Sequence, residues 1–343
     1  MFFPISKNKI YFDCARSGGM SNELLNWRKK HENLFLKNGS LFRENNEKFI
    51  EEVRHGISKF MGVKNNYTFL TSSFSLGFQT LLSFLTPQLK FLVLKGDYPS
   101  IINGLKLRNF NYEVLDQTFD LEAKILKIIE KGSVNVLMLS IVQYINGIYT
   151  DINFFKKLKK NYPDLLIIAD GTQFCGTKHF NFDNSGIDVL ISSGYKWVYG
   201  GYGNGFLLIN KGIDRYISKS VVKKSNYNLL KKVFEPGNLD TLCFGSLLFS
   251  LKLITNYGID KIEKKINDLS LYAKAQFLKF NLLDDISKFR NNHSNIYSLN
   301  GNEELYLKLL NNGIVCSFRG ERIRVSLAFF NTEKQIDELL RFF

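Results

Sequence analysis

Asp170 and Lys196 are the residues of this chain whose types and positions first suggest chemistry. A lysine amine can form a Schiff base with an aldehyde, and a carboxylate can keep a proton on a ring nitrogen. Each residue ends or closely follows a short run of Ile, Leu and Val, LLIIAD (165–170) and DVLISS (188–193). Neither charge is cheap to bury alone, so a site that buries both must provide partners for them. Pyridoxal phosphate is a ligand that uses both groups at once.

The apolar runs at 165–170, 188–193 and 205–209 are each too short for a free-standing helix. They are separated by Gly and Asn, which predicts buried strands. In an open parallel sheet, the carboxyl ends of the strands form the ligand crevice. We therefore expect the polar residues after these strands to converge on one site. An unrelated parallel sheet with an Asp-Gly turn and a surface lysine would produce the same local pattern.

A further candidate is the segment YTFLTSSFSLGFQ (67–79), which is typical of a strand, a turn and a helix. Ser before an apolar-periodic run indicates a helix N-cap, and the free N–H groups of a helix N-terminus bind phosphate. An ordinary capped helix is the other interpretation. We prefer phosphate binding because the helix directly follows a strand.

The spacing of polar residues around the first two runs carries a resemblance to a known family. Gln173 lies three residues after Asp170, and Ser193, Tyr195 and Lys196 follow the second run. This layout resembles the class V aminotransferase and cysteine desulfurase family of pyridoxal-phosphate enzymes, in which Asp-x-x-Gln precedes Ser-x-His-Lys by the same interval. Tyr195 stands where the family usually has His. A Tyr before the lysine occurs in the kynureninase-like branch, so the cofactor prediction is unchanged.

The resemblance implies a role for each matched residue. Lys196 would carry the cofactor as a Schiff base and then move protons, and Asp170 would keep the pyridine nitrogen protonated. Phe74, through its N–H, and Ser75, through N–H and hydroxyl, would bind the phosphate. The full set of implied cofactor-binding residues is Phe74, Ser75, Tyr98, Gln143, Asp170, Gln173, Ser193, Tyr195, Lys196 and Asn238.

Three of these assignments have plain structural alternatives. Tyr98, in GDYP, would stack on the pyridine ring, whereas a lone Tyr at a strand end is otherwise a turn residue. Gln143 would face the cofactor's phenolic oxygen, but a loop amide can also cap backbone groups. Asn238 replaces a family Thr that reaches the phosphate of the neighbouring subunit's cofactor, and an amide can still donate to phosphate.

Arginines near both ends of the chain are the candidate substrate-binding residues. Arg324, in RIRVS, matches the family arginine that grips the substrate's α-carboxylate, a task suited to the planar guanidinium fork. Arg16 could also touch a substrate, and an exposed arginine in a plain turn is an equal alternative. Arg319 and Arg322 are less specific and are interpreted as solvated strand charges. The pattern RIRVS followed by NTEKQID resembles the isopenicillin-N-epimerase-like branch most.

Several reactions share the first step in this family, namely transamination, desulfuration, cleavage and epimerisation. Desulfurases place a nucleophilic Cys on a loop near the C-terminal domain, but FRGERIRVS (318–326) contains none. Cys316 precedes it on an apparent strand, where a core thiol is expected. We predict transamination of a small amino acid or amine through Lys196. The alternatives are a lyase, an epimerase or a cysteine desulfurase on the same scaffold.

The resemblance also implies the architecture, an α/β fold of the fold-type-I pyridoxal-phosphate-dependent transferases. A large cofactor-binding domain, 21–235, would carry a mostly parallel sheet. A smaller α+β domain, 236–343, would pack with the N-terminal segment, 1–20. Active sites in this family form between two subunits, so we expect a homodimer.

Composition narrows the remaining classes. The net charge of +14 comes from 46 Lys and Arg against 32 Asp and Glu, but the lysines are scattered at helical spacing. Solvated helix faces explain this pattern, so we expect no nucleic-acid partner. The four cysteines form no C-x-x-C pair, which argues against metal sites and disulfides. No apolar run reaches about 18 residues and no signal peptide is visible, so we expect no membrane partner and a cytoplasmic location.

Overall fold

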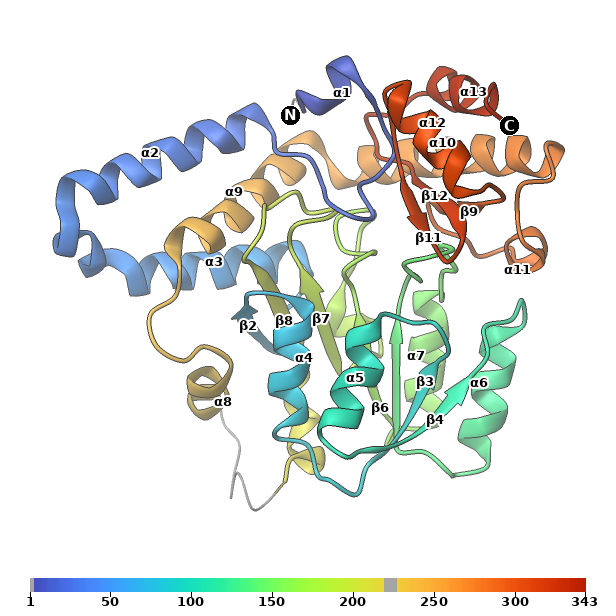
Figure 1. The fold of residues 1–343 in the computed structure, drawn as a ribbon. Helices are drawn as coiled ribbons and strands as arrows, with labels where there is room; N and C mark the ends of the chain where they lie inside the picture. Colours follow the sequence, from blue (N-terminus) through green and yellow to red (C-terminus); the bar gives the residue numbers. More distant parts are fainter. Residues whose placement is uncertain (1–2, 219–226) are drawn as a thin grey trace.

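A seven-stranded sheet forms the centre of the computed structural model, which describes residues 3–218 and 227–343 (Figure 1). The strand order is β2-β8-β7-β6-β5-β3-β4. Five strands are parallel to one another, namely β4, β3, β5, β6 and β7. Strand β8 is antiparallel to its two neighbours, β7 and β2. This mostly parallel sheet confirms the predicted α/β fold. The strands are β2 (Tyr67–Thr71), β3 (Lys90–Leu94), β4 (Asn111–Leu115), β5 (Val136–Ser140), β6 (Leu166–Asp170), β7 (Val189–Ser193) and β8 (Gly205–Ile209).

Helices cover both faces of this sheet, which is why its inner strands are apolar throughout. Side chains alternate between the faces along each strand: Leu92 and Leu94 pack in one core cluster, and Phe91 and Val93 pack in the other. The second cluster includes α4 (Phe74–Leu82), α5 (Pro99–Leu107) and α8 (Tyr227–Phe234). The first includes α3 (Asn46–Phe60), α6 (Leu121–Glu130), α7 (Ile152–Asn161) and α9 (Thr241–Tyr257). A register slip of one residue would therefore move each side chain into the opposite core, where the packing does not match it.

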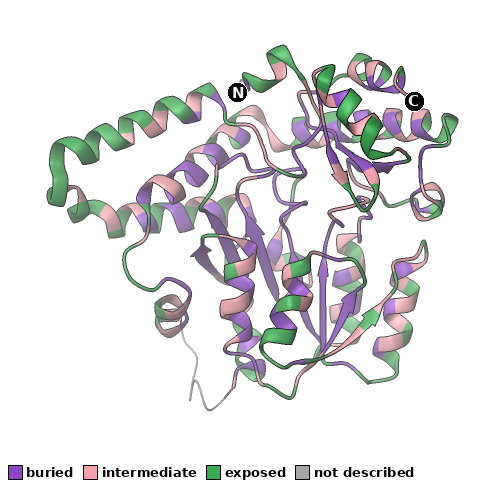
Figure 2. Cartoon of the chain, in the orientation of Figure 1, coloured by how far each residue is buried: buried purple, intermediate pink, exposed green. Residues whose placement is uncertain are grey.

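Residues 22 to 61 form two helices, α2 (Asn22–Asn38) and α3 (Asn46–Phe60), and the polar segment between them folds as η1 (Gly39–Asn45). The Ser21 hydroxyl accepts a hydrogen bond from Leu24 N and begins α2. Figure 2 shows α2 largely exposed along an arm that α3 and α9 share. Helix α9 packs against both α2 and α3, and about half of its residues are buried.

A smaller sheet of order β11-β12-β9 lies near the C-terminus (Figure 1). It consists of β9 (Ile296–Leu299), β11 (Ser317–Arg319) and β12 (Arg322–Ser326), which are antiparallel. Near it, β1 (Ile10–Tyr11) pairs in parallel with β10 (Ile314–Val315), so the start of the chain joins the C-terminal strands. The remaining helices are α1 (Ile5–Asn8), η2 (Phe182–Asn184), η3 (Lys211–Tyr216), α10 (Ile259–Lys279), α11 (Asp285–Phe289), α12 (Glu303–Asn311) and α13 (Glu333–Leu340).

Helix α13 begins at a capping box, in which the Thr332 hydroxyl accepts from Gln335 N and the Gln335 side chain accepts from Thr332 N. In the part of the chain that the structure describes, no single helix has the length and apolarity to cross a membrane. Helices α9 and α10 have that length and apolarity only when they are taken together as a pair, and the pair is bent by 76°.

Candidate active site

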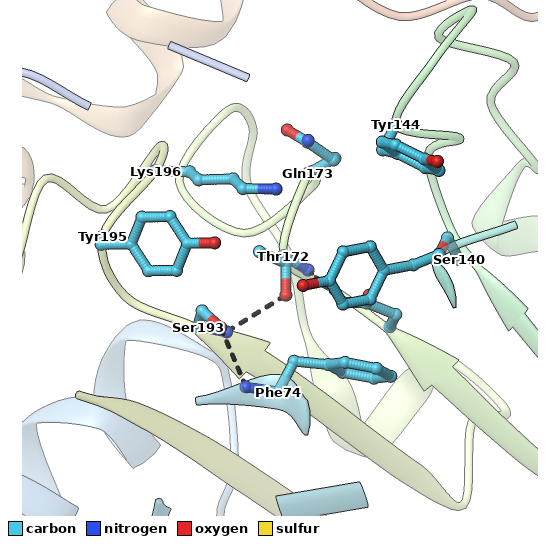
Figure 3. Close-up of a pocket in the computed structure, with 10 residues that line it drawn as sticks. Phe74, Ser140, Tyr144, Thr172, Gln173, Ser193, Tyr195 and Lys196 are labelled. Atoms are coloured by element: carbon cyan, nitrogen blue, oxygen red, sulfur yellow. Dashed lines mark hydrogen bonds between the residues drawn. The ribbon is translucent and has the colours of Figure 1, made fainter. Parts of the chain in front are cut away.

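The carboxyl ends of β5, β6 and β7 bring the predicted residues together. Asp170 is the last residue of β6 and Ser193 the last of β7, and these parallel strands are paired neighbours. Lys196 follows three residues later and points into the same pocket, as does the hydroxyl of Tyr195 (Figure 3). The residues that line this pocket are Phe74, Tyr98, Ser140, Tyr144, Asp170, Thr172, Gln173, Ser193, Tyr195 and Lys196.

Asp170 and Lys196 are both buried, with exposed fractions of 5% and 7%. Burial raises the pKa of Asp170, which the Thr172 hydrogen bonds and the Lys196 charge oppose. Burial likewise lowers the pKa of Lys196, and the Asp170 carboxylate opposes that shift. The amine is therefore neutral at lower pH than an ordinary lysine, which makes it a better nucleophile toward an aldehyde. Its Nζ lies 6.0 Å from the ring centroid of Tyr98 and 5.8 Å from that of Tyr195.

The N-terminus of α4 forms one wall of the pocket. Phe74 N donates to Ser193 Oγ at 2.9 Å, and Ser193 N donates to Thr172 Oγ1 at 3.1 Å (Figure 3). These contacts place a helix N-terminus and a hydroxyl side by side, which is a suitable environment for phosphate. The Ser75 hydroxyl, by contrast, shares a hydrogen bond with Ser100 Oγ at 2.8 Å and does not line the pocket.

Aromatic rings surround the lysine amine. The Tyr98 ring meets Phe74 edge-on at 5.9 Å and Tyr144 edge-on at 5.8 Å. Tyr195 stacks on Tyr202 with a centroid separation of 5.0 Å. Such rings offer flat apolar contact to a planar ligand and hold one another in place.

Gln143 is not at the pocket, contrary to the expectation from sequence. Its Nε2 donates to Asp97 Oδ2 at 3.2 Å, and its Oε1 accepts from Gln117 Nε2 at 3.2 Å. The buried Asp97 carboxylate also accepts from Ser140 and from Tyr98 N, because an unpaired charge at this depth would be costly. The amide is therefore used behind the pocket, and the side chain of Tyr144 lines it instead.

Gln173 lines the pocket as predicted but is held by protein groups at both ends of its amide. Nε2 donates to Ala15 O at 2.8 Å, and Oε1 accepts from Trp197 Nε1 at 2.7 Å. The N-terminal segment thus lies against the site, and Gly18 N donates to Tyr195 O at 2.8 Å. A Cβ on Gly18 would lie 2.0 Å from the Lys196 carbonyl oxygen, so only glycine fits there.

Arg324 lies behind Tyr144 rather than on the pocket wall. Its Nη1 donates to Tyr144 O at 2.9 Å, and its Nη2 donates to Asp13 Oδ1 and to Ser317 Oγ, both at 3.2 Å. Its Nε is buried and has no hydrogen-bond partner among the described residues. Arg324 is thus held by three groups, and its buried Nε is the one guanidinium nitrogen without a partner among the described residues.

Two further predicted residues lie outside the pocket of this chain. Arg16 is exposed on the N-terminal segment and does not line the pocket. The Asn238 side chain accepts from Arg43 Nη2 at 3.0 Å, also away from the pocket. Within a single chain, neither residue lines the pocket.

None of the four cysteines lines the pocket. Burial raises the pKa of Cys14, Cys175, Cys243 and Cys316, to about 12 for Cys175 and Cys316. A thiolate nucleophile at the site is therefore absent from this chain.

Sequence reasoning missed three lining residues and one supporting residue. Ser140 ends β5, and Thr172 lies inside the Asp-Gly-Thr-Gln turn, so the strand-end rule could have found both. Asp97 directly precedes Tyr98 and could have been found with it. Tyr144 lies in a loop, where no periodic signal points to it.

These groups fit pyridoxal phosphate. A buried carboxylate, a buried amine of lowered pKa, a helix N-terminus with hydroxyls and an aromatic ring all face one pocket at the ends of parallel strands. Fold and site together define a pyridoxal-phosphate-dependent enzyme of the fold-type-I class, and pyridoxal 5'-phosphate is its cofactor.

The chain belongs to the aminotransferase class-V family, whose model matches residues 22–339. A search of curated proteins finds no match. Among solved structures, the chain resembles the cystine C-S lyase C-DES in complex with cysteine persulfide, with 17% identity, 99% of each chain covered and a TM-score of 0.85. It also resembles a cysteine desulfurase from Thermococcus onnurineus NA1, with 15% identity, 99% and 94% coverage and a TM-score of 0.81. A lysine-to-alanine variant of C-DES, with glycine covalently linked to its cofactor, matches with 16% identity, 99% and 97% coverage and a TM-score of 0.82. At these identities the likeness shows the fold.

Proposed function

We propose that this enzyme catalyses transamination of a small amino acid or amine, with Lys196 as the group that moves the proton. The observation that carries the proposal is the state of Lys196. It is the single amine among the residues lining the pocket, it is buried, and burial lowers its pKa. A neutral amine held at this position can accept a proton and return it to a neighbouring atom.

Each remaining residue then has a task that its own geometry supports. Bound pyridoxal phosphate supplies an electron sink for the charge left when a bond at the substrate's α-carbon breaks. Asp170 holds the proton of the ring nitrogen, and the N–H of Thr172, 2.8 Å from Oδ1, keeps that carboxylate oriented. Lys196 Nζ takes the α-proton and returns it. Arg324, which lies behind Tyr144, supplies the positive charge that would attract the substrate carboxylate, and its Nε is the nitrogen left without a partner among the described residues.

The other chemistries of the family find less support in the pocket. Epimerisation needs a second base, but apart from Asp170, which is assigned to the ring nitrogen, the titratable groups that line the pocket beside Lys196 are phenols, and burial raises the pKa of Tyr144 and raises that of Tyr195 to about 12. Desulfuration through a protein persulfide needs a thiolate, and none of the cysteines lines the pocket. A cysteine desulfurase is therefore disfavoured here too.

A lyase that eliminates a group from the substrate's β-carbon is the second candidate. It shares Lys196 and Asp170, requires no protein thiol, and could use the Tyr98 or Tyr195 hydroxyl to protonate a leaving group. The likeness to a cystine C-S lyase over 99% of the chain favours this candidate over the epimerase.

The test is to incubate the purified holoenzyme with a panel of amino acids and amines and to identify the products. We expect a keto acid in equal amount to pyridoxamine phosphate in the first half-reaction. Release of ammonia together with a keto acid, without pyridoxamine phosphate, would replace transamination by elimination. A Lys196→Ala protein should show neither product, and turnover by this variant would overturn the role of Lys196.

The same proposal includes a homodimer and a cytoplasmic location. Asn238 lies away from its own chain's pocket, as a residue that serves the neighbouring subunit would. Sedimentation should give a dimer, and Asn238→Ala should weaken cofactor binding. A monomer would contradict the homodimer, and unchanged cofactor binding by Asn238→Ala would contradict the role of Asn238.

A further inference from the structure

Arg319 lies on the strand that helps to hold the proposed carboxylate-binding residue. Side chains two residues apart on a strand lie on the same face, so Arg319 and Ser317 share a face of β11. The Ser317 hydroxyl contacts Asp13 and Arg324, which identifies this face as the one toward the site. Phe318, on the opposite face, stacks on Tyr306 at 5.9 Å within the small core. The Arg319 side chain therefore starts out on the active-site side.

The turn after β11 lies against the loop that lines the pocket. A Cβ on Gly320 would be 3.7 Å from the side chain of Ile145, the residue that follows Tyr144. Burial raises the pKa of Tyr144, and the Arg319 charge is the first of the groups that oppose this rise. The same charge contributes to the lowered pKa of Lys196, after burial and after Arg324. Arg319 is thus close enough to act on two groups of the pocket.

The other two arginines of this region have hydrogen-bond or ion-pair partners, whereas Arg319 has none among the described residues. The Arg322 guanidinium donates to Ser298 and to Leu282 O, and Arg324 is paired with Asp13. Arg319 is exposed, and within residues 3–218 and 227–343 its side chain makes no hydrogen bond or ion pair. An exposed guanidinium without a partner among the described residues attracts an anion, and its planar fork suits a carboxylate.

We propose that Arg319 binds a second carboxylate of the substrate, so that the substrate class is an amino acid with an acidic side chain. The inference rests on the proposed function, because it assigns the α-carboxylate to Arg324. Ser317 is the register partner of Arg324 on β12, and Arg319 lies two residues, about 7 Å, further along β11. The two arginines therefore lie on adjacent strands, where the two carboxylates of one aspartate or glutamate could each meet a guanidinium. Arg319 is then the residue that determines specificity.

The first experiment compares acidic substrates with their neutral amides. Holoenzyme, its Arg319→Gln variant and its Arg341→Gln variant are assayed with aspartate, glutamate, asparagine and glutamine. Arg341 is exposed on the C-terminal helix end, so it controls for the loss of one positive charge. We expect R319Q to raise KM for the acidic pair about tenfold or more and to leave the amides unchanged. R341Q should leave all four unchanged.

The second experiment does not depend on turnover. Succinate and butyrate, which differ by one carboxylate, are titrated into the holoenzyme by calorimetry. R319Q should bind succinate about tenfold or more weakly than the unchanged protein does and should bind butyrate equally well. R319K should bind succinate more tightly than R319Q does. Equal weakening of both acids, or of neither, would overturn the assignment of Arg319.

The two proposals fail in distinguishable ways. If keto acids form from neutral and acidic amino acids equally well, the specificity role of Arg319 is wrong and transamination stands. If succinate binds through Arg319 but no amino acid yields a keto acid, transamination is wrong and the dicarboxylate site stands.

Discussion

Replacing Asp13 by asparagine removes the carboxylate that pairs with the buried guanidinium of Arg324. Asp13 Oδ1 accepts from Arg324 Nη2 at 3.2 Å and from Ser317 Oγ at 2.5 Å, and both charged side chains are at most 5% exposed. At that separation and an effective dielectric constant of about 20, the attraction is about 5 kcal/mol. Removing one partner of a buried pair costs about 3–5 kcal/mol, because the other charge stays buried and unpaired.

The matched control is Asp116→Asn. Asp116 pairs with Lys95 at 3.1 Å, but the two side chains are 72% and 73% exposed. Solvent screens such a pair, so its loss should cost no more than about 1 kcal/mol. Urea unfolding of the two apo-proteins, followed by circular dichroism, measures both free energies of unfolding.

Asp13→Asn should also change ligand binding in the opposite direction. Without Asp13, the Arg324 charge has no anionic partner, so a substrate carboxylate should bind more tightly even though the protein is less stable. Calorimetry with butyrate measures this affinity. The reasoning is refuted if Asp13→Asn and Asp116→Asn lower stability equally, or if butyrate binds Asp13→Asn no better than the unchanged protein.

Three further predictions concern the lysine, an ion pair and a glycine. Burial lowers the pKa of Lys196, so the rate at which the apo-protein takes up the cofactor should reach its plateau below pH about 10.4, the pKa typical of an exposed lysine. Stopped-flow absorbance at a series of pH values measures this rate. A rate that keeps rising up to that pH would contradict the prediction. Glu235→Gln should lower the free energy of unfolding by about 3–5 kcal/mol, because it leaves buried Arg54, whose Nε lies 3.0 Å from Glu235 Oε1, without its main partner. The double variant Arg54→Met, Glu235→Leu should lose less unfolding free energy in the same urea titration, because both charges are gone. The reverse order would be inconsistent with a buried ion pair. Gly18→Ala should weaken cofactor binding in an absorbance titration, since its Cβ would lie 2.0 Å from Lys196 O, and unchanged binding would show that the N-terminal segment can move without disturbing the site.

The sequence determined the scaffold of the site because its signals are local. Short Ile- and Leu-rich runs broken by Gly and Asn form strands, and parallel strands bring their carboxyl ends to one edge. This rule predicts that Asp170, Ser193 and Lys196 share one pocket, and the structure has them there. The Ser73 cap at the start of α4 is equally local, since it depends on residues within one turn.

Only the tertiary structure decided which side chains are free to face a ligand. The Gln143 amide donates to Asp97, a buried carboxylate that needs hydrogen-bond donors, and the Tyr144 side chain lines the pocket in its place. Arg324 finds Asp13 across 311 residues of chain, and no periodic pattern in the sequence reports such a pairing. The physical reason is that backbone periodicity depends on neighbouring residues, whereas hydrogen-bond partners are chosen among groups that folding brings together from distant parts of the chain.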